Sequence, residues 1–139
     1  MSTITVGFIK CAMVYFLAAM LLGIYMSSSG PIHPWMPIHV HLNLLGWMSM
    51  MIYGVAYHIL PRFSGRPLWS DRLSVWHIWL ANIGLVGMAA GWMISGSSGT
   101  NVLVIFSVVE AISIIFFATN MLKTVKAVPP PPKPAAAVK

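Results

Sequence analysis

Four apolar runs, each close to the length that crosses a lipid bilayer, most constrain what this chain can fold into. They cover residues 5–27, 38–60, 73–95 and 101–122. An α-helix needs about 20 predominantly apolar residues to cross about 30 Å of hydrocarbon. A backbone exposed to lipid must also satisfy its own hydrogen bonds, which favours helices. We therefore expect an all-α fold, a four-helix transmembrane bundle within residues 1–126.

The scarcity of charge supports a membrane protein over a soluble one. Only 7% of the 139 residues are charged, whereas a soluble domain carries roughly a quarter. The net charge of +6 would suggest nucleic-acid binding in a soluble protein. Here the cations stand at the ends of the apolar runs and in the tail, so we expect no nucleic-acid partner and a lipid bilayer instead. The length leaves no room for a separate catalytic domain.

The positions of the cations also predict the orientation of the bundle. Arg62, Arg66 and Arg72 lie between the second and third runs, and Lys123 and Lys126 follow the fourth. The other two connections carry no charged residue. By the positive-inside rule, both termini and the arginine-containing loop lie in the cytoplasm.

Proline and glycine set the remaining features of the chain. Residues 127–139 are rich in proline and alanine, and we expect a disordered cytoplasmic tail there. In the third run, Gly87 and Gly91 are four residues apart, a spacing that lets two helix backbones approach closely. Gly46 in the second run leaves room either for a neighbouring helix or for a flat cofactor.

Two histidines at the start of the second run, His39 and His41, are the strongest candidates for a functional site. Two residues along a helix, their side chains point about 200° apart, toward nearly opposite faces. This geometry disfavours one chelated zinc ion and favours two separate planar cofactors, or one ligand and one hydrogen-bonding ring. Imidazole is a common axial ligand of haem iron. His33, just before the run, is the best second ligand for His41 within one chain.

Three further polar groups have both structural and functional interpretations. His58 and His77 stand near helix ends, where water and backbone carbonyls can satisfy them. We therefore interpret them as structural, the alternative being a second haem at the inner side.

Glu110 lies near the middle of the fourth run, where an ionisable group is expensive and often functional. It could relay protons, hydrogen-bond a haem propionate, contact a quinol, or form a neutral carboxyl bonded to a neighbouring helix.

Part of the chain resembles late helices of the catalytic subunit of haem–copper oxidases. The resemblance is closest to the cbb-type cytochrome c oxidases and the related nitric oxide reductases. It is carried by residues 39–47 (HVHLNLLGW), 54–62 (GVAYHILPR) and 70–84 (SDRLSVWHIWLANIG).

The resemblance implies roles for the residues of the first of these stretches. In that family the first histidine of the pair ligates the high-spin haem and the second the low-spin haem. Carried over, His39 and His41 would bind haem iron, with Gly46 and Trp47 as neighbours of the cofactor. The family's copper ligands and the second ligand of its low-spin haem come from other helices, which no run here resembles. The chain therefore cannot assemble an oxygen-reducing centre alone.

We accordingly expect a b-type haem protein with one or two haem b groups, acting as an electron-transfer module rather than an enzyme alone. It would be a homodimer or a subunit of a redox complex, and would pass electrons between quinol and a periplasmic carrier. It would lie in the inner membrane of a prokaryote, with its haem site near the outer face. One alternative is a subunit that supplies a haem ligand to a split oxidase or nitric oxide reductase.

The other alternative is a protein that handles or assembles copper or haem. His33 and the methionines Met48, Met50 and Met51 make copper at the outer side conceivable, because thioether sulfur is a soft ligand. Those methionines also fit a place in the core or against lipid.

Overall fold

The computed structural model of the protein describes residues 1–29, 33–94 and 96–127, and the predicted tail falls almost wholly outside these ranges. Every regular element in the described residues is helical, which confirms the all-α prediction. The elements are α1 (Thr3–Ser29), α2 (Trp35–His41), the π-helix η1 (Leu42–Ser49), α3 (Met50–Phe63), α4 (Asp71–Met93) and α5 (Gly96–Thr124). Since α2, η1 and α3 run on without a break, they form one long helix over Trp35–Phe63.

The predicted four spans are present, with ends a few residues from those expected. Four helices are long and apolar enough to cross a membrane: Thr3–Ser28, Trp35–Phe63, Asp71–Met93 and Ser98–Thr124. The second one begins earlier than residue 38 and continues past Pro61. Pro37 stands in its first turn and Pro61 in its last, and at helix ends the missing N–H of proline costs little.

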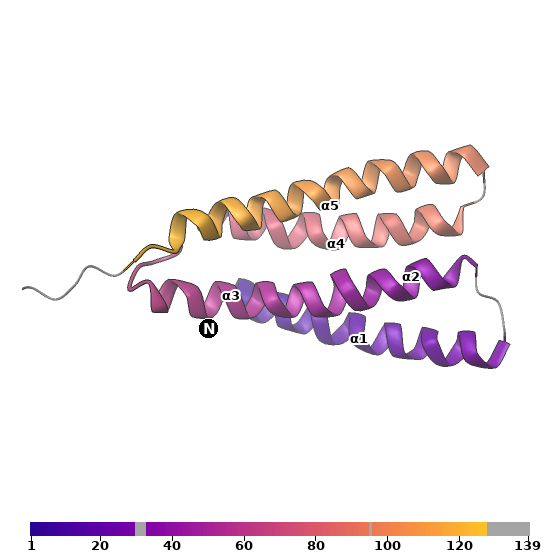
Figure 1. Ribbon diagram of the computed structural model, residues 1–139, viewed down its shortest axis with the longest axis horizontal. Coiled ribbons are helices and arrows are strands. Elements are labelled where there is room, and N and C mark those ends of the chain that lie inside the picture. The colour runs from indigo at the N-terminus through magenta and orange to yellow at the C-terminus, as the bar shows by residue number, and fades with distance from the viewer. Residues whose placement is uncertain (30–32, 95, 128–139) are drawn as a thin grey trace, which may run out of the picture.

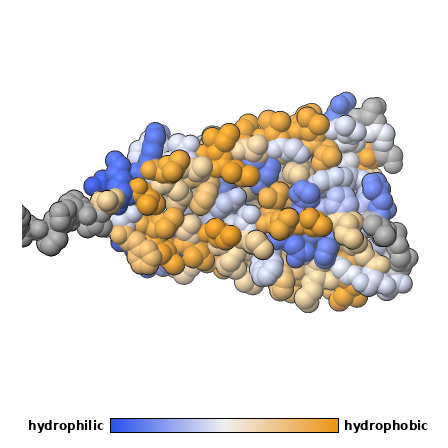
Figure 2. Space-filling view, viewed as in Figure 1, coloured by the Kyte–Doolittle hydropathy of each residue, from blue (hydrophilic) through white to orange (hydrophobic). Residues whose placement is uncertain are grey.

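The four spans form two hairpins that lie side by side (Figure 1). One consists of α1 and the long helix α2–η1–α3, and the other of α4 and α5. We call one end of the bundle the basic end, because Arg62, Arg66, Arg72 and Lys123 lie at or beside its helix ends. The opposite end, where α2 begins, is the HVH end. Apolar residues cover much of the surface between the two (Figure 2).

Helices α4 and α5 pack together along most of their length. On α4, six of the eight buried residues are spaced alternately by three and four: Ser74, His77, Ala81, Gly84, Met88 and Gly91. This is the spacing of left-handed helix pairs. At Gly87 an added Cβ would collide with the Phe106 ring of α5, and at Gly91 it would lie 2.8 Å from the backbone of Leu103. The close approach predicted from the two glycines is confirmed.

Hydrogen bonds fix the register of this hairpin at the basic end. The backbone N–H of Ser70 donates to Asn120 Oδ1 at 3.0 Å, and Asn120 Nδ2 donates to the Ser70 carbonyl at 2.8 Å. The Trp69 N–H donates to Thr124 Oγ1 at 3.0 Å. Polar side chains of α5 thereby satisfy the backbone that leads into α4, and they hold the two helices in one alignment.

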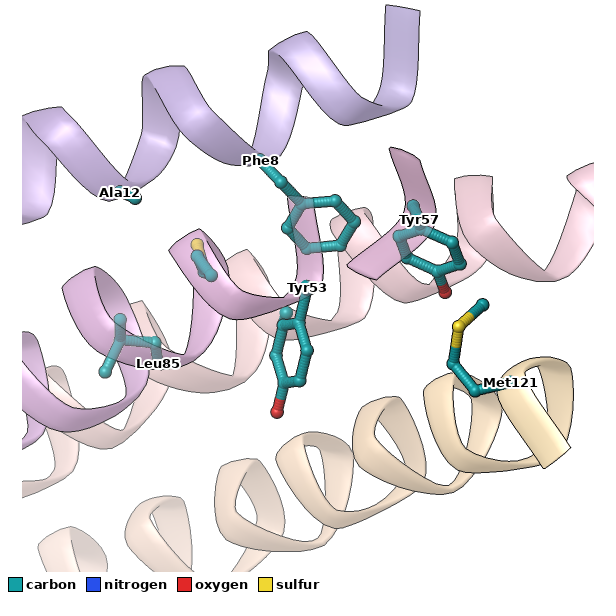
Figure 3. Close-up of a cluster of buried hydrophobic side chains, with 8 residues drawn as sticks. Phe8, Ala12, Tyr53, Tyr57, Leu85 and Met121 are labelled. Carbon is teal, nitrogen blue, oxygen red and sulfur yellow. The ribbon is translucent and has the colours of Figure 1, made fainter. Parts of the chain in front are cut away.

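An aromatic cluster joins the two hairpins in the half of the bundle nearer the basic end. Phe8 of α1 stacks on Tyr57 of α3, with ring centroids 5.7 Å apart, and meets the edge of Tyr53 at 5.8 Å. Met121 of α5 closes the cluster from the other hairpin (Figure 3). Close packing of buried side chains of this kind gives the two hairpins a fixed relative position.

Candidate functional site

His39 of α2 turns toward α1. Its Nδ1 lies 2.9 Å from the carbonyl oxygen of Ala19, and an added Cβ at Gly23 would lie 3.1 Å from its Cε1. Because a carbonyl can only accept, Nδ1 carries the hydrogen and Nε2 of the neutral ring keeps a lone pair. The Asn43 side chain approaches that Nε2 at 3.4 Å. The ring is therefore fixed by one nitrogen and presents the other as an acceptor.

His41 turns toward α4, on the other side of α2. Its Nδ1 lies 2.8 Å from the Pro37 carbonyl oxygen, so Nδ1 again donates and Nε2 keeps a lone pair. Its ring packs on Trp92 of α4, with centroids 4.5 Å apart. Figure 1 shows α2 running between α1 and α4. The two rings thus leave α2 toward different helices, as their spacing in the sequence indicated.

The donor set of these two histidines fits haem iron or another metal. A metal-binding imidazole usually donates through one nitrogen to a carbonyl or carboxylate and binds through the other. Both His39 and His41 have this arrangement. The described residues contain no group of three or more His, Cys, Asp or Glu side chains that could together hold a metal ion. A metal bound here would need porphyrin nitrogens or ligands from another chain.

A surface groove lies beside His39 at the HVH end. It has a volume of about 390 Å³ and is lined by Gly23, Met26, Ser27, Met36 and His39. The groove is open on the outside of α1 and α2. Anything bound to His39 there would meet lipid or another protein on its far side.

His33 and His41 share Trp92 as a neighbour. His33 is exposed and lines a pocket of about 330 Å³ together with Gly91, Trp92 and Leu103. The Trp92 ring is the one that His41 packs against. The structure places His33 and His41 in the same region of the HVH end, and His33 as second ligand to His41 stays a prediction.

Gly46 and Trp47, both in η1, lie against α1. An added Cβ at Gly46 would lie 2.7 Å from Tyr15 Cβ and 3.0 Å from Leu85 Cδ2. Trp47 packs on Phe16, with ring centroids 4.4 Å apart. Helix packing accounts for both residues in this structure, and their role as cofactor neighbours stays a prediction.

Glu110 lies apart from the two histidines. Its side chain is buried and rests against Gly84 of α4, where an added Cβ would be 2.6 Å from Oε2. The eight residues from Gly84 to Trp92 span about 12 Å of helix. The structure therefore does not group Glu110 with His41, although both face α4.

The expectation that His77 lies near a helix end where outside water can reach it is wrong, and its interpretation as a structural residue stays a prediction. Its neighbours Trp76 and Trp79 are 61% and 63% exposed, whereas His77 itself is fully buried. Its Nδ1 lies 2.9 Å from the Tyr57 hydroxyl, and its ring packs among aromatic rings that include Phe8 at 4.7 Å. The signal for this burial was available in the sequence, because His77 stands seven residues before Gly84 on the same helix face.

His58, in contrast, accepts a hydrogen bond from Arg62 at 2.7 Å on the exposed surface.

The π-helix that follows His41 was not foreseen. Asn43 Nδ2 donates to the carbonyl oxygen of His39 at 2.9 Å, the acceptor that the N–H of residue 43 would use in an α-helix. A side chain inserted in this way loosens the regular ladder. Such π segments often mark functional sites. A polar residue four positions after a histidine was the signal in the sequence.

The methionines proposed for copper are not gathered at one place. Met48 is exposed and Met50 is buried in the aromatic core cluster, while His33 lies at the HVH end. Their side chains serve different surroundings.

Comparison with known proteins decides the family. The family described as cytochrome C and quinol oxidase polypeptide I matches residues 32–129, which is most of the chain. The chain belongs to this family. The match covers the two candidate iron ligands and the three spans that follow α1.

Individual members of the oxidase polypeptide I family are similar over a shorter stretch. Cytochrome c oxidase subunit 1 of Rhodobacter capsulatus is 43% identical over 63 residues, or 45% of this chain and 12% of that protein. The Cbb3-type cytochrome c oxidase subunit CcoN1 of Stutzerimonas stutzeri is 40% identical over 63 residues, or 45% of this chain and 13% of that protein. A cytochrome c oxidase subunit 1 of Thermus thermophilus is 35% identical over 60 residues.

The chain thus spans only about an eighth of the length of the first two relatives. No solved structure is similar enough to count as a match. Family membership and four membrane-length helices make the chain an integral membrane protein related to a fragment of oxidase subunit I. The relatives named here are bacterial.

Proposed function

We propose that this chain is a b-type haem protein that transfers electrons within a membrane, with His39 and His41 as ligands of haem iron. The observation that carries the proposal is that both rings donate through Nδ1 to a backbone carbonyl. Each Nε2 is left with a lone pair that could bind a metal, and in His39 the Asn43 side chain approaches it only at 3.4 Å. Bound haem would supply one-electron chemistry between ferric and ferrous iron. The chain supplies the ligands, their orientation and the apolar surroundings that tune the potential.

The open groove beside His39 favours a site completed by another chain. Within the groove, the described residues offer a single imidazole and the thioethers of Met26 and Met36. In a two-fold dimer the same groove of a second copy would face it, since such an interface pairs each surface patch with itself. The two His39 rings could then supply both axial ligands of one haem. A larger redox complex could complete the site in the same way.

The direction of electron transfer follows from the expected orientation. With the basic end in the cytoplasm, the HVH end lies at the outer face of an inner membrane. Electrons from quinol would then reach haem b near that face and leave to a periplasmic carrier. One or two haem b groups fit this arrangement, because His39 and His41 point to different helices.

Haem retention in purified variants tests the proposal. The full chain would be expressed with adequate haem supply, and pyridine haemochrome would measure haem per chain in wild type, His39→Ala and His41→Ala. His58→Ala is the matched control, because it removes the same group from the other end of the bundle. We expect wild type and the control to carry the same haem and at least one of the other variants to lose it. Equal haem in all four proteins would refute the ligand assignment.

A second candidate function is a haem-ligand subunit of a split oxidase or nitric oxide reductase. Two observations favour it: the similarity to subunit 1 of cytochrome c oxidases, and a groove beside His39 that is open to another chain. In that case the protein would co-purify with a larger haem- or copper-bearing chain. Oxygen or nitric oxide consumption by that complex would be lost in His39→Ala. A stable homo-oligomer with both axial positions filled would exclude it.

A further inference from the structure

Three buried polar atoms have no hydrogen-bond partner among the described residues, and all three belong to residues of α4 or α5. They are His77 Nε2, Ser113 Oγ and Glu110 Oε2. Each residue is at most 5% exposed. Buried polar groups are nearly always paired with protein or with water, and inside a membrane an unpaired one is more expensive still. Three in one helix pair therefore need a common explanation.

The three atoms follow one another along the helix pair. The ring of His77 lies level with Phe117, at a centroid distance of 5.4 Å, and Glu110 lies against Gly84. Ser113 stands between Phe117 and Glu110 on the same face of α5. Along the helix axis, Ser113 is therefore about 4.5 Å from Glu110 and about 6 Å from the level of His77. Bound water ordinarily pairs buried polar atoms that have no protein partner.

At the basic end the row connects to a pocket that holds charged groups. The Tyr57 hydroxyl lies 2.9 Å from His77 Nδ1. Tyr57 also lines a pocket of about 250 Å³ whose other walls include His58, Arg62 and Asp71. Of these three, Arg62 and Asp71 are exposed. The pocket can therefore exchange protons with water outside the bundle.

We propose that a proton passes between this pocket and the Glu110 carboxyl along Tyr57, His77 and Ser113, with bound water completing the row. The fully buried Ala81 stands opposite Ser113 in the register of the two helices. Its methyl group cannot pair with Ser113 Oγ, so we assign that role to water.

Each step of the transfer balances in protons. The Tyr57 hydroxyl gives its proton to His77 Nδ1 and takes one from water in the pocket. The ring then releases the proton on Nε2 to water beside Ser113, and that water delivers a proton to a Glu110 carboxylate oxygen. Tyr57, His77 and the water beside Ser113 end with the charge they began with. The Glu110 carboxylate gains one proton, and the pocket loses one, which exchange with outside water replaces. Transfer in the opposite direction restores the starting tautomer of His77. Such a row suits uptake and release of single protons by Glu110.

The proposal goes beyond haem binding and does not depend on it, since no residue of the row is a candidate iron ligand. It is tested by infrared spectroscopy of the full chain in lipid nanodiscs. The carboxyl C=O band that Glu110→Gln removes would be followed after transfer to D₂O, which shifts the band on exchange. We expect Tyr57→Phe to slow this exchange about tenfold, equivalent to about 1.4 kcal/mol in the barrier, and Ser113→Ala to slow it as well.

Tyr53→Phe is the matched control, because Tyr53 lies in the same aromatic cluster and its ring is 4.6 Å from that of His77. It should exchange at the wild-type rate. Equal slowing in Tyr53→Phe and Tyr57→Phe would overturn the proposal, since loosened packing would then explain both. A wild-type rate in Tyr57→Phe, or no carboxyl band assignable to Glu110, would also overturn it. None of these outcomes depends on how much haem the protein binds, so the proton row and the haem assignment can fail separately.

Discussion

Replacing Tyr57 with phenylalanine should destabilise the bundle measurably while preserving its shape. The change removes the one hydrogen bond that His77 makes among the described residues, and it keeps the ring that stacks on Phe8. An unsatisfied buried polar group costs about 1–3 kcal/mol in soluble proteins. Interhelical hydrogen bonds in a membrane protein average about 0.6 kcal/mol and reach about 1.7 kcal/mol. We therefore expect Tyr57→Phe to lower the free energy of unfolding by about 1 kcal/mol.

A double-mutant cycle with His77→Leu isolates this hydrogen bond from other effects. Unfolding by sodium dodecyl sulfate in mixed micelles, followed by circular dichroism, would give the free energy for wild type, both single variants and the double variant. The coupling should fall between about 0.6 and 1.7 kcal/mol. Independent sites add within about 0.3–0.5 kcal/mol. A coupling energy smaller than about 0.3–0.5 kcal/mol would mean that the Tyr57 hydroxyl does not stabilise His77.

Three other predictions concern packing, the site and orientation. Gly87→Val should lower the free energy of unfolding by about 1–3 kcal/mol, because the larger side chain collides with α5. Ala90→Val, on the exposed side of α4, should not lower it. Equal unfolding curves for the two variants would refute the close contact. Gly23→Ala should displace the His39 ring, which lies 3.1 Å from the new Cβ, and so reduce haem per chain at unchanged helix content; full haem retention would contradict this. In a protein whose single cysteine, Cys11, is replaced by serine, Ser98→Cys should react in intact cells with a membrane-impermeant thiol reagent, while a cysteine placed between α3 and α4 stays unlabelled. The reverse labelling would contradict the expected orientation.

Most of the architecture could be predicted from the sequence because one physical rule dominates it. A bilayer accepts apolar helices of a fixed length, so four runs gave four spans. Their ends were harder to place, since proline is tolerated in a first or last turn, as at Pro37 and Pro61. The opposed directions of His39 and His41 followed from helix geometry alone and are present in the structure.

The polar interior was harder to predict, because an apolar helix in a membrane has no single hydrophobic face. His77 was expected near a helix end within reach of water, and it is fully buried instead. The His77 side chain points into the bundle because it falls in the series of buried residues spaced by three and four along α4. The same series places Gly84 against Glu110. Reading that spacing, rather than the neighbours in sequence, would have placed His77 correctly.

The central claim is that histidine nitrogen binds haem iron in this chain, and nitrogen hyperfine spectroscopy tests it most directly. The protein would be produced with ¹⁵N in histidine alone, and pulsed electron paramagnetic resonance would be recorded on the ferric state. We predict a strongly coupled histidine ¹⁵N in wild type that is lost when His39 and His41 are both replaced by alanine. A haem-free protein, or haem iron with no coupled histidine nitrogen, would contradict the account.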